Sequence, residues 1–318
     1  MYQSFSELFD RGELDETGAR EFLANVGFSD PAVAYERLTQ MADAGPDRHE
    51  FCRCLPTLLI TLADIADPDG VLITFDHFLQ NVPDKLEMFR FLGDSPRAVE
   101  MLVGLSMSSE FLSEILRKNP AYLGPLANYH HLAELKSRQD FFAAAQKAVA
   151  EADDAAEQLD ALRRYQRWEL LRIGACDLFG LADMRSVTIQ LSLLADALVQ
   201  SSLIIAARQA DVEADNFAVV AMGKLGGEEL NYSSDIDLIF LTHGDAGSYR
   251  RLGQNLIRAI NQSTQEGFLY RVDMRLRPWG RSGELVTKVS GYLDYLQNNA
   301  MLWEKQALLK ARIIAGDM

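Results

Sequence analysis

Apolar residues recur at intervals of three and four through most of residues 1–212. The stretch DFFAAAQKAVAEADDAAEQLDALRRYQRWELLRIGACDLFG, which begins at Asp140, combines this spacing with many Ala, Leu, Glu, Gln and Arg residues. Such a pattern predicts amphipathic helices. Prolines and turn residues at Asp67-Pro68, Asp94-Ser95-Pro96 and Asn119-Pro120 divide the region. We therefore expect about eight to ten helices before residue 213.

The pattern changes near residue 215. FAVVAM (217–222) and IDLIFLT (236–242) are short apolar runs rich in β-branched residues, and GFLYRVDMRLRP (267–278) alternates apolar and polar positions. These features predict three strands. Residues 248–264 carry a helical stripe between the second and third strands, and the tail from 289 returns to helical spacing.

The order of these elements predicts an α+β fold with two parts. A chain of 318 residues with 48% hydrophobic content is long enough for two domains. We expect a long all-helical N-terminal region over residues 1–212. A core with a small mixed sheet and a C-terminal helix would follow over residues 213–318, and we expect this core to be truncated at its C-terminus.

The composition limits the classes of molecule that we expect as binding partners. Lys and Arg total 31 against 46 Asp and Glu, and the formal charge of -15 opposes binding to nucleic acid. No run of apolar residues approaches the length that spans a membrane, and the polar N-terminus lacks the apolar segment of a signal peptide. Three cysteines are too few for a disulfide framework. We expect a cytoplasmic protein without nucleic-acid or membrane partners.

A glycine-rich segment, GKLGGEELNYSSDIDLIF at 223–240, begins after the first predicted strand and runs into the second. Residues without a Cβ can turn backbone N–H groups toward an anion at close range. Gly223, Gly226 and Gly227 therefore suit a phosphate group. Glycine turns after strands are common, so this feature does not identify an anion site by itself.

Two aspartates enter the second predicted strand at alternate positions. Asp235 and Asp237 therefore project from one face, while Ile236 and Leu238 pack on the other. Two carboxylates placed in this way either repel each other or hold a divalent cation. The competing interpretation is ordinary turn chemistry at a strand start.

A third carboxylate, Asp273, lies within the third predicted strand. A carboxylate in a strand interior is unfavourable unless it is paired or bound to metal. Three carboxylates on adjacent strands would suit Mg²⁺, which commonly serves substrate phosphates and acts as a pair of ions in nucleotidyl transfer. Arg275 and Arg277 repeat with the same period, and they either clamp a phosphate or pair with the aspartates.

These motifs carry a resemblance to a known family. A strand, a glycine turn, Asp-x-Asp and a later aspartate resemble the DNA polymerase β-like nucleotidyltransferase superfamily. More closely, the glycine segment, YRVDMRLRPWGRSGELV and WEKQALLKAR resemble glutamine synthetase adenylyltransferase, from about residue 90 onward. The long helical leader, Asn231 and Met274 are most similar to the N-terminal adenylyl-removing half of that bifunctional family, whereas WEKQAL is also similar to the transferase half.

The resemblance implies a role for each matching residue. Asp235, Asp237 and Asp273 would be the catalytic residues and the metal ligands. The cofactor would be Mg²⁺, bound as two ions. The substrates or products would be ATP or ADP and inorganic phosphate. The residues that would contact them are Gly223, Lys224, Gly226, Gly227, Ser233, Ser234, Arg275, Arg277 and Lys310 or Arg312.

The resemblance also implies an activity in the control of nitrogen metabolism. Inorganic phosphate would remove AMP from a tyrosine of glutamine synthetase and give ADP. The alternatives are ATP-dependent adenylylation of the same protein, transfer of AMP to a small molecule, and an inactive fragment that only docks. The implied partners are glutamine synthetase and a PII-type signalling protein.

Overall fold

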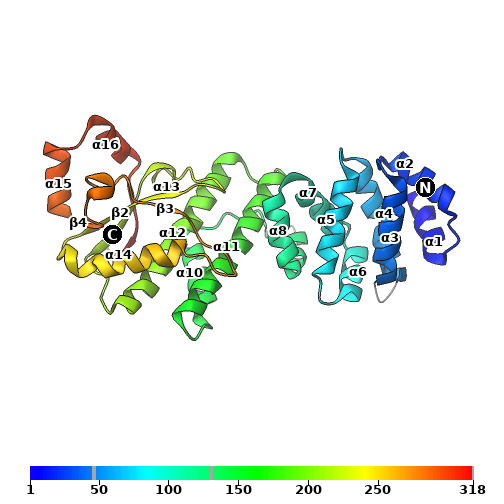
Figure 1. The fold of residues 1–318 in the computed structure, drawn as a ribbon, viewed down its shortest axis with the longest axis horizontal. Coiled ribbons are helices and arrows are strands. Elements are labelled where there is room, and N and C mark those ends of the chain that lie inside the picture. Colours follow the sequence, from blue (N-terminus) through cyan, green and yellow to red (C-terminus); the bar gives the residue numbers. More distant parts are fainter. Residues whose placement is uncertain (45–47, 129–131, 317–318) are drawn as a thin grey trace. The chain divides into compact units, whose positions relative to one another are not determined.

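The computed structural model describes residues 1–44, 48–128 and 132–316, and it confirms the α+β class (Figure 1). Two compact units make up the chain: Met1–Ala133 with Gly174–Leu181, and Glu134–Ile173 with Ala182–Met318. Much of the helical region therefore belongs to the same unit as the sheet. A domain boundary between residues 212 and 213 stays a prediction.

The first unit is built from short helices. Side chains of Asp15, Asp67 and Asp84 accept hydrogen bonds from backbone N–H groups in the first turns of three of them. The described part of residues 1–212 holds twelve α-helices, which is more than expected. Two of them are short early helices that end at Gly12 and Gly27, glycines with a left-handed backbone conformation. The helices of this unit are α1 (Tyr2–Arg11), α2 (Glu16–Val26), α3 (Pro31–Ala44), α4 (Arg48–Ala63), α5 (Pro68–Gln80), α6 (Lys85–Asp94), α7 (Pro96–Ser108), α8 (Glu110–Lys118), the 3-10 turn η1 (Pro120–Tyr122) and α9 (Leu123–Ala127).

Three helices follow: α10 (Arg138–Ala150), α11 (Ala155–Leu178), which contributes residues to both units, and α12 (Met184–Ala210). Of these, α11 and α12 are longer than any helix named above. By length and composition α12 is apolar enough to cross a membrane, but 78% of its most apolar window is buried inside the protein. It packs against α10, α14 (Ala246–Asn261) and the last strand. We therefore describe α12 as the core helix of the second unit.

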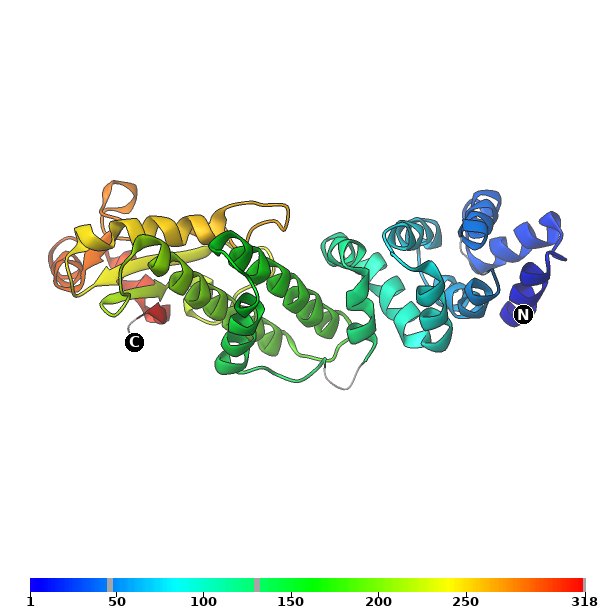
Figure 2. The same cartoon turned by 90° about the horizontal axis from the view of Figure 1, so that it is seen from below.

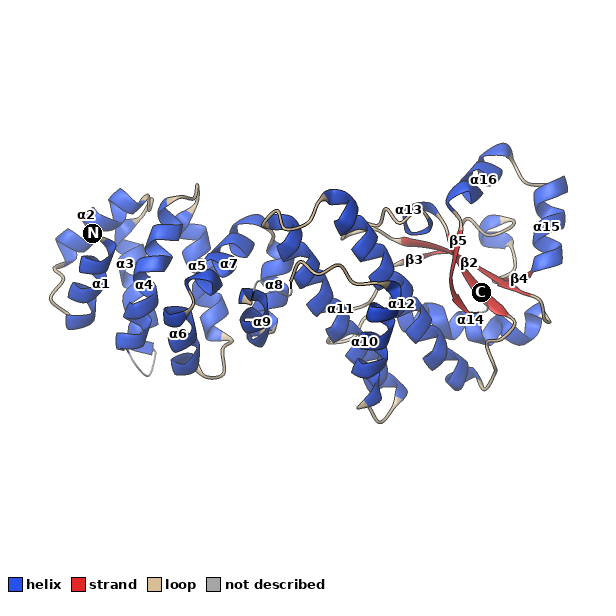
Figure 3. Cartoon of the chain, turned by 180° about the vertical axis from the view of Figure 1, so that it is seen from behind, coloured by secondary structure: helices blue, strands red, loops and turns tan. Residues whose placement is uncertain are grey.

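The second unit contains a five-stranded mixed sheet (Figure 3). β1 lies between β2 and β5 and is antiparallel to both. β3 and β4 run parallel to β2, with β3 beside its beginning and β4 beside its end. The strands are β1 (Phe217–Ala221), β2 (Ile236–Thr242), β3 (Val272–Asp273), β4 (Val286–Lys288) and β5 (Arg312–Gly316).

The two faces of the sheet pack against different helices. Ile236, Leu238 and Phe240 of β2 are fully buried on one face, along which α14 runs, drawn in yellow in Figure 2. On the opposite face Ile239 packs with tyrosines of α15 (Val289–Asn298). Because side chains alternate along a strand, Asp237 lies on the same face as Ile239.

The third strand and the tail differ from the sequence-based expectation. Only residues 272–273 of the expected strand 267–278 pair as β3, because the Asp273 carboxylate accepts a hydrogen bond from the Arg275 N–H at 2.8 Å and turns the chain. The helical expectation for the tail holds for α15, α16 (Leu302–Ala307) and the 3-10 turn η4 (Leu308–Lys310), but residues 312–316 form β5. Another 3-10 turn, η3 (Gly280–Ser282), precedes β4.

Candidate active site

The glycine segment begins with one helical turn, α13 (Gly223–Gly226), directly after β1. Gly223 has a φ of 55°, a left-handed conformation that favours glycine. A Cβ at this position would lie 2.6 Å from Oδ2 of Asp237. The turn therefore places backbone directly against one of the candidate carboxylates.

The three aspartates lie in or next to the segment where β2 and β3 pair. Asp237 and Asp273 are partners in the parallel register of these strands. Asp235 lies two residues before Asp237, on the same face. The strand pairing thus brings Asp237 beside Asp273, while a site shared by all three carboxylates stays a prediction.

The carboxylates of Asp235 and Asp273, on either side of Asp237, each form an ion pair with an arginine. Arg271 donates from Nε to Oδ1 of Asp235 at 2.6 Å, and Arg275 donates from Nε to Oδ2 of Asp273 at 2.7 Å. The hydrogen bond from Arg275 holds the pKa of Asp273 below its usual range.

The central carboxylate is electrostatically different. Partial burial, together with the negative charges of Asp273 and Asp235, raises the pKa of the Asp237 carboxyl group despite the opposing charge of Arg275. A cation placed here would stabilise the ionised form of Asp237.

The donor set fits a hard divalent cation, since all three side chains offer carboxylate oxygens. Among the described residues, no group of three or more acidic, imidazole or thiol side chains is gathered closely enough to hold a metal ion in this arrangement. Asp235 and Asp273 face their arginines instead. Metal binding would therefore require these ion pairs to open.

The other residues predicted to contact nucleotide or phosphate include several in or near α13, which we call the glycine turn (Gly223–Gly226). Lys224 and Ser233 are exposed, and Ser234 donates from Oγ to Asn231 Oδ1 at 2.6 Å. Lys310 pairs through Nζ with Glu229 Oε2 at 2.6 Å. The backbone oxygen of Lys310 lies 2.2 Å from where a Cβ on Gly226 would be, so η4 packs directly on the glycine turn.

The predicted phosphate ligand Arg277 points elsewhere. Its guanidinium donates to the carbonyl oxygens of Met274 at 2.8 Å, Arg281 at 3.1 Å and Gly283 at 3.3 Å, which closes the loop after β3. Arg277 also lines a cavity of about 420 Å³ with Arg250 of α14. The structure does not bring Arg277 to the three aspartates.

Sequence reasoning missed the role of two residues around the site. Arg271 precedes Asp273 by two positions, so strand alternation was a signal for a third basic side chain there. Asp196 lies in the apolar run QLSLLADALVQSSLII, where a lone carboxylate indicates a buried partner. Arg312, expected as a possible nucleotide contact, pairs with Asp196.

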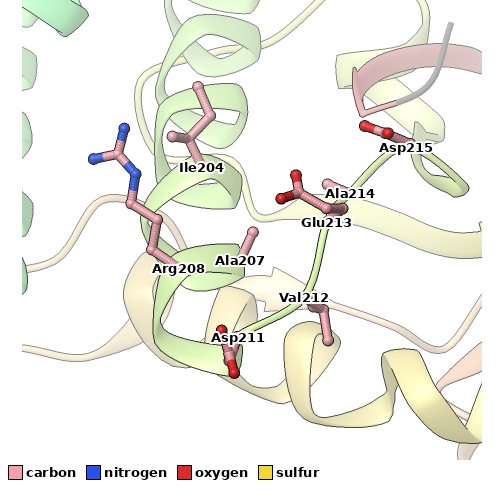
Figure 4. Close-up of a pocket in the computed structure, with 8 residues that line it drawn as sticks. All are labelled: Ile204, Ala207, Arg208, Asp211, Val212, Glu213, Ala214 and Asp215. Atoms are coloured by element: carbon pink, nitrogen blue, oxygen red, sulfur yellow. The ribbon is translucent and has the colours of Figure 1, made fainter.

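A separate cavity of about 540 Å³ lies at the C-terminal end of α12, shown in Figure 4. Asp211, Glu213 and Asp215 line it from the loop that leads to β1, while the guanidinium of Arg208 points away from these carboxylates. None of the predicted catalytic or nucleotide-binding residues lines it. We assign it no part in the candidate site.

Comparisons with known proteins give matches to one enzyme family. The family model for glutamate-ammonia ligase adenylyltransferase matches residues 99–318. Proteins of Chromobacterium violaceum and Neisseria meningitidis serogroup B, both named bifunctional glutamine synthetase adenylyltransferase/adenylyl-removing enzyme, are 33% and 34% identical over 93% and 95% of this chain. A Pseudomonas aeruginosa protein of the same name is 30% identical over 95% of it. The chain spans only 34–35% of the length of these relatives.

Proposed function

The chain belongs to the glutamate-ammonia ligase adenylyltransferase family, and from this premise we propose that it catalyses metal-dependent nucleotidyl transfer at Asp235, Asp237 and Asp273. The names of its relatives combine attachment and removal of an adenylyl group. Of these two reactions we propose removal. The similarity of Asn231, Met274 and the helical leader to the adenylyl-removing half supports this direction.

One observation carries the proposal. Asp237 and Asp273 are paired residues on neighbouring strands, and Asp237 also lies against Gly223. Carboxylates and a close-approach glycine turn therefore meet at one place. Nucleotidyl transfer needs this combination, because negative charge must be neutralised where a phosphate can approach closely.

In the proposed reaction, inorganic phosphate attacks the phosphorus of adenylylated tyrosine in glutamine synthetase. A bond forms between this phosphorus and a phosphate oxygen, the bond to the tyrosine oxygen breaks, and the tyrosine leaves with a proton to give ADP and free tyrosine. Bound Mg²⁺, which we propose as two ions, would neutralise charge on the transferred group.

The protein side chains would position these groups. Asp237 is the central ligand candidate, and Asp235 and Asp273 would complete the set after releasing their arginines. Arg275, which is exposed and held only by Asp273 among the described residues, would then be available to the attacking phosphate. Lys224, which lies in the glycine turn, and Ser233 are both exposed and are the further candidates for phosphate contacts.

The partner and location follow from the same proposal. Glutamine synthetase is the protein that the relatives' names identify as a target, and we propose it as the target here, with a PII-type protein as regulator. Cys52, Cys54 and Cys176 are buried and form no disulfide bond. Free thiols suit the reducing conditions of the cytoplasm, where we place the reaction.

The direction is tested by supplying adenylylated glutamine synthetase with phosphate and Mg²⁺ and measuring ADP. We expect ADP release that needs both phosphate and the modified protein, and that the Asp235→Asn/Asp237→Asn double variant abolishes. Consumption of ATP with unmodified synthetase would establish the forward reaction instead. Turnover without any protein acceptor would identify a small-molecule substrate, and binding to the synthetase without turnover of either kind would identify a docking module.

Arg271→Ala is expected to tighten Mn²⁺ or Mg²⁺ binding by about fivefold in the absence of nucleotide. Arg271 competes with a cation for Asp235, and an ion pair as exposed as this one contributes at most about 1 kcal/mol. Isothermal titration calorimetry or Mn²⁺ electron paramagnetic resonance measures the change without depending on activity. Arg250→Ala, which removes an exposed arginine of α14 with the same loss of charge, is the control. Equal affinities in the two variants would show that Arg271 does not compete with the metal.

A further inference from the structure

Helix α12, which is buried and largely apolar, carries a stripe of polar side chains on one face. Ser192, Asp196 and Gln200 recur every four residues, so they lie on one face. Ser192 Oγ accepts a hydrogen bond from the N–H of Leu230 at 3.1 Å, and Gln200 Oε1 accepts one from the N–H of Gly316 at 2.9 Å. This face of α12 therefore holds both Leu230, within the glycine segment, and the end of β5.

Asp196 is the centre of the stripe. Its side chain is 1% exposed, and it pairs with Arg138 of α10 at 2.8 Å and with Arg312 of β5, whose Nη2 lies 3.1 Å from Oδ1. A buried carboxylate is tolerated only with such partners, since losing one leaves an uncompensated charge. Burial raises the pKa of Asp196, while both arginines oppose that change.

Arg312 has a second set of contacts, and these reach the glycine turn. Its Nη2 donates to the carbonyl oxygen of Leu225 at 3.0 Å, and its Nε donates to that of Gly226 at 3.4 Å. One planar guanidinium thus joins a buried helix to two consecutive carbonyls of α13. A lysine has no comparable fork and cannot make these bonds together.

We propose that Arg312 is a positioning residue for nucleotide binding. It holds the carbonyl side of the glycine turn against Asp196, so that Gly223 stays beside Asp237 and the turn keeps the shape that receives a phosphate. This inference rests on the proposed function, because it concerns the same turn. It assigns Arg312 a role distinct from that of Lys310, whose side chain is half exposed and pairs with Glu229.

Arg138 provides a matched control within the same cluster. Both arginines pair with Asp196, but of the two only Arg312 donates to the glycine turn in the hydrogen bonds described for these residues. Arg312→Lys and Arg138→Lys each keep the charge and remove the guanidinium fork. A role limited to neutralising Asp196 predicts similar effects for both substitutions, whereas positioning predicts an effect on the turn for Arg312→Lys alone.

The test measures ADP affinity by calorimetry in the presence of Mg²⁺, together with amide hydrogen exchange. We expect Arg312→Lys to weaken ADP binding about tenfold, and Arg138→Lys to change it less than twofold. The amides of Gly226 and Gly227, which bond to the carbonyls of Met222 and Gly223 at 3.0 and 3.1 Å, should exchange about tenfold faster in Arg312→Lys. In Arg138→Lys their exchange should stay as in the wild type.

The two readouts separate this inference from the proposed function. If the wild-type chain binds no ADP, the proposed function fails, and the exchange of Gly226 and Gly227 still decides whether Arg312 holds the turn. Equal exchange and equal affinity in the two lysine variants would overturn the inference. If Arg312→Lys does not fold, Asp196→Glu displaces the same guanidinium by one methylene, and the same loss of affinity and protection is expected.

Discussion

Replacing Asp237 by Asn is expected to lower nucleotidyl-transfer turnover about 1000-fold, equivalent to on the order of 4 kcal/mol of transition-state stabilisation. Asp237 lies between the other two carboxylates of the site and against Gly223. An amide keeps the shape of the side chain but removes the charge that would bind a cation. The measurement is the initial rate of ADP release from adenylylated glutamine synthetase at saturating phosphate and Mg²⁺.

Urea unfolding shows whether a loss of activity in Asp237→Asn is caused by loss of the fold. Folding raises the pKa of Asp237, so the ionised carboxylate destabilises the metal-free protein at neutral pH. We therefore expect Asp237→Asn to unfold at the same or a slightly higher urea concentration than the wild type. Asp215→Asn, at an exposed position on the loop before β1, should leave both rate and stability unchanged. Wild-type activity in Asp237→Asn would remove this residue from the catalytic site.

Gly226→Ala is expected to destabilise the second unit by about 3 kcal/mol and to reduce turnover at least tenfold. The new Cβ would lie 2.2 Å from the backbone oxygen of Lys310 and 2.7 Å from that of Ala221. Both neighbours are backbone atoms, so α13 or η4 must move. All three tryptophans, Trp168, Trp279 and Trp303, lie in this unit, and intrinsic fluorescence during urea unfolding reports its stability.

Gly291→Ala is the matched control for that substitution. Gly291 lies in α15, and nothing is within 4 Å of its added Cβ. Alanine is favoured over glycine in helices, so this variant should be more stable by up to about 1 kcal/mol. If Gly226→Ala were as stable and as active as Gly291→Ala, the close packing of η4 on the glycine turn would be contradicted.

The strands that the sequence predicted well are those specified by local composition. β1 and β2 are continuous apolar runs beside a glycine turn, and their predicted bounds agree with the structure to within one residue. β4 and β5 were missed because each pairs with a strand distant in sequence, and β4 has only three residues. Local spacing in WEKQALLKARIIA favours a helix, and only tertiary pairing with β1 turns its last residues into a strand.

The sequence identifies the candidate site as a set of residues more than as a set of contacts. Alternation placed Asp235 and Asp237 on one face, and the unfavourable burial of Asp273 marked it as a partner. Alternation also placed Arg277 beside Asp273, but the turn formed after Asp273 redirects it to loop carbonyls. Sequence spacing could not show that turn, because a side-chain to backbone hydrogen bond competes with the strand locally.

The position of β5 has a consequence for the order in which the protein folds during synthesis. Arg312 and Asp196 are separated by 116 residues, so α12 and β1 leave the ribosome long before Arg312 does. Until then β1 presents an open edge, which can pair with other chains, and contacts between segments so far apart form slowly. The glycine turn should therefore become ordered last in its unit. Nascent chains that stop before β5 should be prone to aggregation and unable to hold a nucleotide.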